Sequence, residues 1–266
     1  MKKKDIVVFE STVFPGATEE ICGPELESNS RNLKCGRDFF LGYSPERVNP
    51  GDKIHTIDKI NKVIAGQTNE VEKELKKIYS KLTKGKIFLA KNIKVAEASK
   101  VIENSQRDIN IAFINEVSKI CNKINISTYD VLQASLTKWN FLNFEPGLVG
   151  GHCIGVDPYY LAEKAESLKI KPQVILSGRK TNDDMVKFIG KQIDKNLKQN
   201  TKILFLGLTF KEDVPDLRNS KSLDLINFLK NKKYNVTIYD PYIEGLRGLK
   251  SLNICNAKKA TFDSIV

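Results

Sequence analysis

The stretch of sequence that decides the fold is residues 93–124, IKVAEASKVIENSQRDINIAFINEVSKICNKI. Its apolar and small side chains recur at steps of three and four residues, which is the period of an amphipathic helix. This stripe comprises Ala98, Ile102, Ser105, Ile109, Phe113, Val117, Ile120 and Ile124. At a rise of about 1.5 Å per residue, such a helix would be about 48 Å long. Ile111 and Ile114 fall on the opposite side, so we expect two covered faces, one against another domain or subunit.

Before this helix, residues 5–90 alternate short apolar runs with helical patterns, which predicts an α/β domain with a parallel sheet. The predicted strands lie in DIVVFEST (5–12), DFFLGYSPE (38–46), NKVIAG (61–66) and KIFLA (86–90). The predicted helices are 16–27 and 68–82, the second with Thr68 as its N-cap. Ligands of parallel sheets bind beyond the carboxyl ends of the strands, where residues 10–12 and 44–46 are expected to lie.

After the long helix, the pattern stays helical to residue 199. Helices are predicted at 129–136 with Ser127 and Thr128 at the cap, at 158–168, and as one long helix at 172–199. Residues 202–208, 220–233 and 235–241 then read as strand, helix and strand, joined by the long loop TFKEDVPDLRN (209–219). We therefore predict three domains, at 1–92, 93–199 and 200–266. The outer two are partial Rossmann-like α/β domains and the middle one is all-helical.

Composition describes an ordinary soluble globular chain, with 41% hydrophobic and 28% charged residues among 266. No apolar run approaches the roughly 18–20 residues that span a membrane, and the run at 6–9 is too short for a signal peptide. We therefore expect a cytoplasmic protein without membrane contact. The net charge of +11 points either to an anionic partner or to compositional bias. The lysines are dispersed and no nucleic-acid motif is present, so nucleic acid is not expected and a phosphorylated small molecule stays open.

The five cysteines are widely spaced without a CxxC pair, and there are two histidines. This pattern predicts neither a disulfide framework nor a metal site.

One cysteine lies in an unusual run, EPGLVGGHCIGVDPYY (145–160), which contains four glycines. Asp157 and Pro158 predict the start of a helix there. Cys153 would lie just before that start, where the helix dipole favours a reactive thiolate. An inert cysteine in a glycine turn is the alternative, and the run alone leaves both open. Lys100 and Asn104 likewise share one helix face, as a site pair or as solvated surface.

Seven motifs in order resemble the nucleotide-sugar 6-dehydrogenases of the UDP-glucose/GDP-mannose dehydrogenase family. They are ESTVFPG (10–16), GYSPERVNPG (42–51), AEASKVIENS (96–105), FINE (113–116), PGLVGGHCIGVDPYYL (146–161), GLTFKEDVPDLRNSKS (207–222) and YDP (239–241). The cysteine motif looks most like the branch acting on UDP-N-acetylglucosamine or UDP-N-acetylgalactosamine.

The resemblance implies an NAD-dependent, four-electron oxidation of the sugar C6 hydroxyl to a carboxylate, for surface polysaccharide precursors. Cys153 would hold the carbon as a thiohemiacetal and then as a thioester. The other implied roles are oxygen stabilisation, water and proton handling, thioester hydrolysis, substrate contact and cofactor contact. Lys100 and Asn104 would stabilise the oxygen, Thr12 and Asp157 would handle water and protons, and Glu46 would assist thioester hydrolysis. The residues expected to contact the substrate are Lys211, Arg47, Gly150 and Gly151. Those expected to contact the cofactor are Arg218, Thr12 and Glu46.

The chain departs from the family at both ends, because it has no GxGxxG turn and stops at TFDSIV. We expect an internal fragment with weak NAD binding and little activity alone. Pro50 stands where the UDP-glucose branch often has a second acidic residue, so a role for a second glutamate is not expected in this chain. The resemblance also implies a homodimer through the central helical domain. A 3-hydroxyacid or 6-phosphogluconate-type dehydrogenase and a non-catalytic UDP-binding or oligomerisation module are the alternatives.

Overall fold

The structure is a computed structural model that describes residues 1–243 and 261–266. Its contacts divide the chain into two compact units. The first unit comprises residues 1–106 and 157–172, and the second comprises 107–156 and 173–266. Cys255 falls outside the described residues. Within the described part of the chain, no helix combines the length and apolar character needed to cross a membrane.

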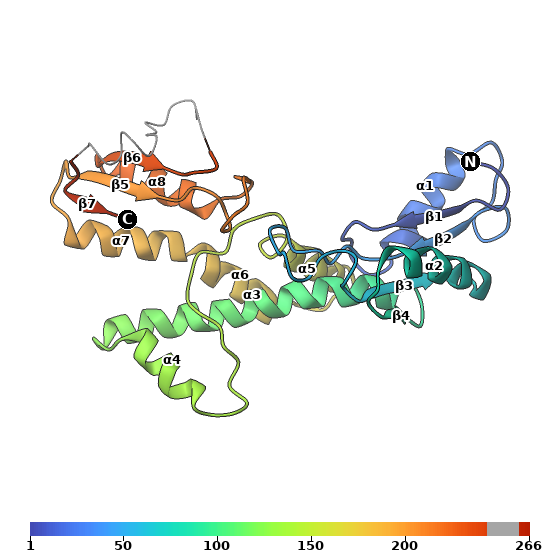
Figure 1. Ribbon diagram of the computed structural model, residues 1–266, viewed down its shortest axis with the longest axis horizontal. Helices are drawn as coiled ribbons and strands as arrows, with labels where there is room; N and C mark the ends of the chain where they lie inside the picture. The colour runs from blue at the N-terminus through green and yellow to red at the C-terminus, as the bar shows by residue number, and fades with distance from the viewer. Residues whose placement is uncertain (244–260) are drawn as a thin grey trace. The chain divides into compact units, whose positions relative to one another are not determined.

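The first unit is built on a four-stranded sheet in the order β1-β2-β3-β4 (Figure 1). The strands are β1 (Ile6–Phe9), β2 (Phe40–Tyr43), β3 (Lys62–Gly66) and β4 (Ile87–Leu89). β1 and β2 run parallel, as do β3 and β4, but β2 and β3 are antiparallel. The expectation of a parallel sheet is therefore wrong for this central pair. Residues 44–61 contain no helix that would carry the chain back across the sheet, as a parallel crossover requires.

Helices cover both faces of this sheet. α2 (Asn69–Leu82) starts as predicted, with the Thr68 hydroxyl accepting a hydrogen bond from the N–H of Val71 at 3.4 Å. Its apolar side packs on one face of the sheet, and the start of α3 (Ile93–Lys123) packs on the other face. A short π-helix (Thr18–Cys22) continues into α1 (Gly23–Ser28), in the place of the single helix predicted at 16–27.

α3 (Ile93–Lys123) confirms the predicted long helix. Several residues of the predicted apolar stripe are nevertheless not buried, because Ile102, Phe113 and Ile120 are 53%, 62% and 54% exposed in the single chain. The side that is buried carries small and polar residues as well as apolar ones: Ala96, Glu97, Val101, Asn104, Ser105, Asp108, Ala112 and Asn115. Polar groups thus take much of the space that the sequence pattern assigned to hydrocarbon.

The second unit begins with the later part of α3 and adds α4 (Thr128–Leu136), with Ser127 as its N-cap. The helix predicted at 172–199 is two helices, α6 (Gln173–Asp183) and α7 (Met185–Asn196). The prediction of one helix was wrong because the two halves pack differently. α6 is tied to α3 by buried polar side chains, whereas α7 packs on α8 (Lys221–Asn231).

A parallel sheet in the order β6-β5-β7 completes the second unit. β5 (Lys202–Leu206) and β6 (Asn235–Tyr239) confirm the predicted strands, and β7 (Ser264–Ile265) adds a third. The core combines apolar residues of β5, β6 and α8. The predicted α/β fold class, with a long helix between two Rossmann-like parts, is confirmed, whereas the domain limits at residues 92 and 199 remain a prediction.

Candidate active site

The first group of predicted site residues lies at one edge of the first sheet. The pairing of β1 and β2 continues past both strands, since Ser44 N–H donates to Phe9 O and Glu46 N–H to Glu10 O, each at 3.0 Å. The segments that carry Thr12 and Glu46 therefore leave the sheet side by side. This is the edge at which open α/β sheets bind nucleotides.

The Glu46 side chain folds back onto the loop after β2 that carries it. Its Oε1 accepts hydrogen bonds from the backbone N–H groups of Arg47 at 2.7 Å and Val48 at 2.6 Å. The Arg47 guanidinium in turn pairs with Glu103 of α3, with 2.8 Å between Nη2 and Oε1, and donates to Asn61 O at 3.2 Å. The loop after β2 is thus fastened to α3, one residue before Asn104.

Asn104 and Asp157 form a buried pair. Their side chains are 5% and 2% exposed, and Asn104 Nδ2 donates to Asp157 Oδ2 at 2.5 Å. α5 (Asp157–Ser167) begins at Asp157, within one residue of the predicted start. Lys100 lies one turn before Asn104 and is partly exposed. The solvated-surface alternative is therefore wrong for Asn104.

Two residues that sequence reasoning missed shape the backbone beside Thr12. The buried carboxylate of Glu97 accepts hydrogen bonds from the N–H groups of Gly16 at 2.5 Å and Thr18 at 2.8 Å. Tyr43 Oη donates to Ser11 O at 3.1 Å. Burial, and after it the charges of Glu97 and Asp157, raises the pKa of Tyr43, so this phenol remains a donor. The AEASK motif contained Glu97, but only the fold shows its partners.

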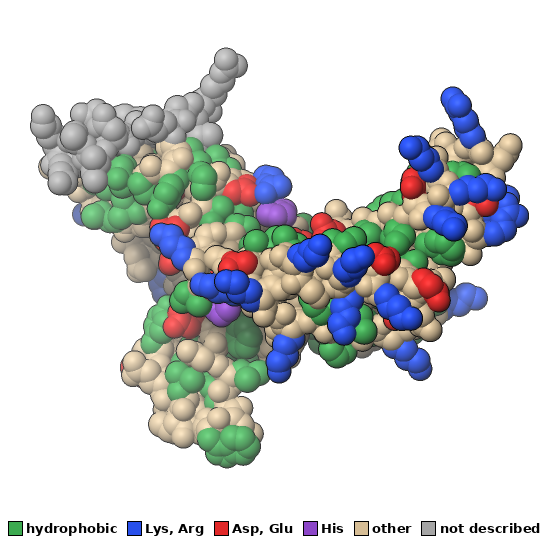
Figure 2. Space-filling model, turned by 45° about the vertical axis from the view of Figure 1, so that its right-hand side comes forward, with side chains coloured by type: hydrophobic (Ala, Val, Ile, Leu, Met, Phe, Trp, Pro, Cys, Tyr) green, Lys and Arg blue, Asp and Glu red, His purple; other side chains and the backbone are tan. Residues whose placement is uncertain are grey.

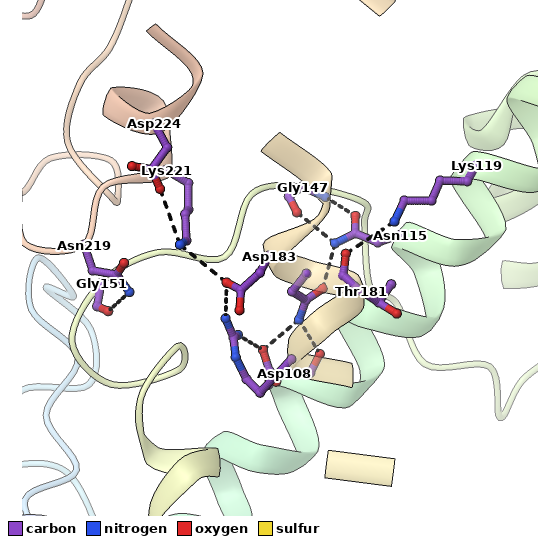
Figure 3. A network of polar contacts seen from close by, with 12 residues as sticks. Asp108, Asn115, Lys119, Gly147, Gly151, Thr181, Asp183, Asn219, Lys221 and Asp224 are labelled. Carbon is purple, nitrogen blue, oxygen red and sulfur yellow. Dashed lines mark hydrogen bonds and ion pairs between the residues drawn. The ribbon is translucent and has the colours of Figure 1, made fainter. Parts of the chain in front are cut away.

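The cysteine run belongs to the second unit, where it packs against the loop 209–219. A Cβ added at Gly150 would lie 2.6 Å from Asn219 O, and one at Gly151 would lie 2.7 Å from the Phe210 ring. Gly151 also has a φ of +82°, and its backbone exchanges hydrogen bonds with Asn219, as Figure 3 shows in part. Both positions therefore need glycine for close packing within the chain. Their predicted substrate contact stays a prediction.

The start of the same run is anchored to α3 through Asn115 (Figure 3). Its amide donates to Gly147 O at 2.9 Å and accepts from Gly147 N–H at 2.8 Å. Asn115 also donates to Asn182 of α6 at 2.8 Å. The FINE motif, which contains Asn115, thus holds the glycine run in place.

Next to Asn182, an ion pair between Arg179 and Asp108 is fully enclosed. The two side chains are 2% and 0% exposed, and 2.5 Å separates Arg179 Nη1 from Asp108 Oδ1. Burial raises the pKa of Asp108 against the opposing charge of Arg179. Arg179 also binds Asp183 at 2.7 Å. This network of buried polar contacts holds α3 and α6 together.

Cys153 is partly buried, is not in a disulfide and lies within electrostatic range of Arg218. Arg218 binds Asp216 through Nη2 and Oδ2 at 2.6 Å, and it lowers the pKa of Asp216 to about 2. A thiolate at Cys153 contributes to raising the pKa of Arg218, after the larger effects of Asp216. His152 Nδ1 lies 3.8 Å from Asp216 Oδ2. The nucleophile candidate therefore lies within the electrostatic reach of a guanidinium.

The predicted site residues divide between the two units. The first unit holds Thr12, Glu46, Arg47, Lys100, Asn104 and Asp157, and the second holds Gly150, Gly151, Cys153, Lys211 and Arg218. Basic side chains are spread over the face seen in Figure 2, between acidic and uncharged ones, rather than gathered into one patch.

Three family models match the chain in order. All three describe the UDP-glucose/GDP-mannose dehydrogenase family: its NAD binding domain at residues 1–83, its central domain at 94–184 and its UDP binding domain at 204–265.

Curated relatives match most of this chain. Protein CapL of Staphylococcus aureus is 56% identical over 241 residues, which is 88% of this chain and 57% of CapL. The UDP-N-acetyl-D-glucosamine 6-dehydrogenase of Pseudomonas aeruginosa is 50% identical over 91% of this chain and 59% of its own length. The enzyme of that name from Salmonella typhi is 43% identical over 100% of this chain and 64% of its own. The chain thus spans less than two thirds of these relatives.

Solved structures have the same fold. UDP-N-acetyl-mannosamine dehydrogenase Cap5O from S. aureus is 34% identical, with a TM-score of 0.80 over 94% of this chain and 59% of that one. NDP-N-acetyl-D-galactosaminuronic acid dehydrogenase from Methanosarcina mazei is 27% identical, with a TM-score of 0.85 over 100% of this chain and 59% of that one.

Proposed function

The chain belongs to the UDP-glucose/GDP-mannose dehydrogenase family, and from this premise we propose that the full-length protein oxidises C6 of a UDP-N-acetylhexosamine to a carboxylate. The buried pair of Asn104 and Asp157 carries this proposal, because it assembles two predicted catalytic groups from distant parts of the sequence. The two relatives named UDP-N-acetyl-D-glucosamine 6-dehydrogenase support the choice of substrate.

The edge of the first sheet fits NAD, since the segments carrying Thr12 and Glu46 leave β1 and β2 together. When bound, NAD accepts one hydride in each of two oxidations. Thr12, Glu46 and Arg218 would contact it.

The chain's own residues handle the carbon and oxygen atoms. Loss of a proton and a hydride converts the C6 hydroxyl to an aldehyde, and Cys153 sulfur adds to it with transfer of the thiol proton to oxygen. Loss of a second proton and hydride leaves a thioester. Water then adds, the carbon–sulfur bond breaks, and the carboxylate departs while Cys153 is restored. Lys100 and Asn104 stabilise the C6 oxygen during these steps.

The remaining groups position water and substrate. Asp157 and Thr12 hold the water and exchange protons, and Glu46 assists hydrolysis of the thioester. Lys211, Arg47, Gly150 and Gly151 contact the UDP-sugar.

The proposal includes a cytoplasmic homodimer that makes a precursor of surface polysaccharide. The three domains at 1–92, 93–199 and 200–266 belong to it as well. The exposed stripe of Ile102, Phe113 and Ile120 on α3 supports the homodimer, since a second copy would cover it.

The test is an assay of the full-length protein with NAD and a panel of UDP-sugars. We expect two NADH per sugar, with an N-acetylhexosamine preferred. Cys153→Ser should stop before the carboxylate forms, because its hydroxyl is a far weaker nucleophile than a thiolate.

An undiminished rate in Cys153→Ser would favour a 3-hydroxyacid or 6-phosphogluconate-type reaction, which needs no thiol. Absence of NADH with every sugar, together with binding of UDP, would favour a non-catalytic module.

A further inference from the structure

Lys62, the first residue of β3, is a buried cation that none of the seven motifs contains. Its side chain is 0% exposed. An ammonium group without water is costly unless it is paired and hydrogen-bonded. Its position therefore requires partners supplied by the fold.

The partners of Lys62 come from the two segments that follow β1 and β2 at the edge of the first sheet. Its Nζ lies 3.7 Å from Glu10 Oε1 and 3.8 Å from Glu46 Oε2, and it donates to Pro45 O at 3.4 Å. The same ammonium lies 5.2 Å from the centre of the Tyr79 ring. One lysine thus connects a residue after β1 with a residue after β2.

The antiparallel pairing of β2 and β3 creates this arrangement. Gly42 is opposite Gly66 and Tyr43 is opposite Ala65, so the loop after β2 passes the start of β3. In a parallel pairing, Lys62 would lie at the other edge of the sheet, away from Glu46.

Glu10 and Glu46 are held in different ways. Glu10 Oε1 also accepts the Tyr79 hydroxyl at 2.7 Å, and burial followed by this contact raises the pKa of Tyr79, which stays a donor. Glu46 has Oε1 on the backbone of its own loop, while Oε2 faces Lys62. Lys62 is therefore in position to direct the second oxygen of Glu46.

We propose that Lys62 is a positioning residue for Glu46 in the hydrolysis of the Cys153 thioester. This inference rests on the proposed function. In that step, the oxygen of water bonds to C6 and the carbon–sulfur bond breaks, so that Cys153 leaves as a thiolate. Glu46 takes a proton from the water and passes it to solvent. Lys62 fixes the carboxylate that receives this proton and balances its charge.

The test compares Lys62→Met with the wild type in the full-length protein, using UDP-N-acetylglucosamine and NAD. Without the ammonium, Glu46 Oε2 loses its anchor, and a misplacement of about 1 Å can cost on the order of 100-fold in rate. We expect two NADH per site in the first turnover at the wild-type rate, followed by steady-state turnover slowed by about 10- to 100-fold. Intact-mass spectrometry should then find the acyl adduct on Cys153.

Three further variants separate positioning from general stability. Lys62→Arg keeps the charge and should restore most of the rate. Lys86→Met makes the same change at an exposed lysine just before β4 and should behave like the wild type. Glu46→Gln should accumulate the same adduct, and adding Lys62→Met to it should slow hydrolysis no further. If Lys62→Met does not fold, Lys62→Gln takes its place with the same expected outcomes.

A Lys62 variant that slows the first turnover as much as the steady state would overturn the inference. So would a double variant whose losses multiply. A wild type that makes no NADH and no adduct with any UDP-sugar would overturn the proposed function itself, and with it this inference. A wild type that turns over beside an adduct-free Lys62→Met would overturn the inference alone.

Discussion

Replacing Arg179 by Met should destabilise the second unit strongly, because it would leave the carboxylate of Asp108 enclosed without its cation. Asp108 is 0% exposed, and its Oδ1 lies 2.5 Å from Arg179 Nη1. At an effective dielectric constant of about 20, the gross attraction at this distance is about 7 kcal/mol. Desolvation of both ions offsets much of it, so the whole pair contributes little net stability.

Removing one partner lowers stability much more than removing the whole pair, because the remaining charge stays buried without its partner. We therefore expect Arg179→Met to lower the free energy of unfolding by about 3–5 kcal/mol. Asn182 Nδ2, which donates to Asp108 Oδ1 at 2.7 Å, is a neutral donor and replaces only part of the lost interaction. Urea unfolding followed by circular dichroism measures the change.

Two variants make this reasoning refutable. Lys180→Met removes a positive charge from the exposed side of the same helix and should change stability by less than about 0.5 kcal/mol. The double variant Asp108→Leu/Arg179→Met removes both charges and should regain much of the loss. An Arg179→Met protein within about 1 kcal/mol of the wild type, or a double variant less stable than the single one, would refute the burial argument.

Two shorter predictions concern the cysteine run. Gly150→Ala should lower the free energy of unfolding by about 1–3 kcal/mol, because its Cβ would lie 2.6 Å from Asn219 O. The Cβ of Gly147→Ala would meet nothing within 4 Å, so this variant should lose far less stability. Urea unfolding compares the two variants. Arg218 lowers the pKa of Asp216 from 3.8 to about 2, so the stability from this pair is present above pH 3.8 and is lost as the pH falls towards 2. The difference in unfolding free energy between the wild type and Asp216→Asn should therefore shrink over that pH range. A difference that stays constant would contradict the role of this pair.

Local signals in the sequence predicted most helices and strands correctly. Thr68 and Ser127 are caps with hydrogen bonds to the following turn, as their residue types and positions indicated. The break at Asp184 was not predictable in this way. The pattern through α6 and α7 is continuous, yet the structure divides it at Asp184, and the two halves have different packing partners.

The orientation of α3 also lay beyond the sequence pattern. Periodicity identifies an apolar stripe but does not say what covers it, and in the single chain Phe113 is 62% exposed. Asn104 is buried because Asp157 lies opposite it, and this partner follows more than 50 residues later. A spacing of four residues between Lys100 and Asn104 carried no information about that contact.

The site residues themselves divide into groups suited to chemistry and groups that hold the backbone. Asn115 and Gly150 lie in family motifs, and both make close contacts that hold the backbone of this chain. A motif match alone therefore does not make a residue catalytic. Conversely, Lys62 lies outside every motif but contacts two of them, at Glu10 and Glu46. Its place at this edge depends on the antiparallel direction of β3, which the expectation of a parallel sheet did not include.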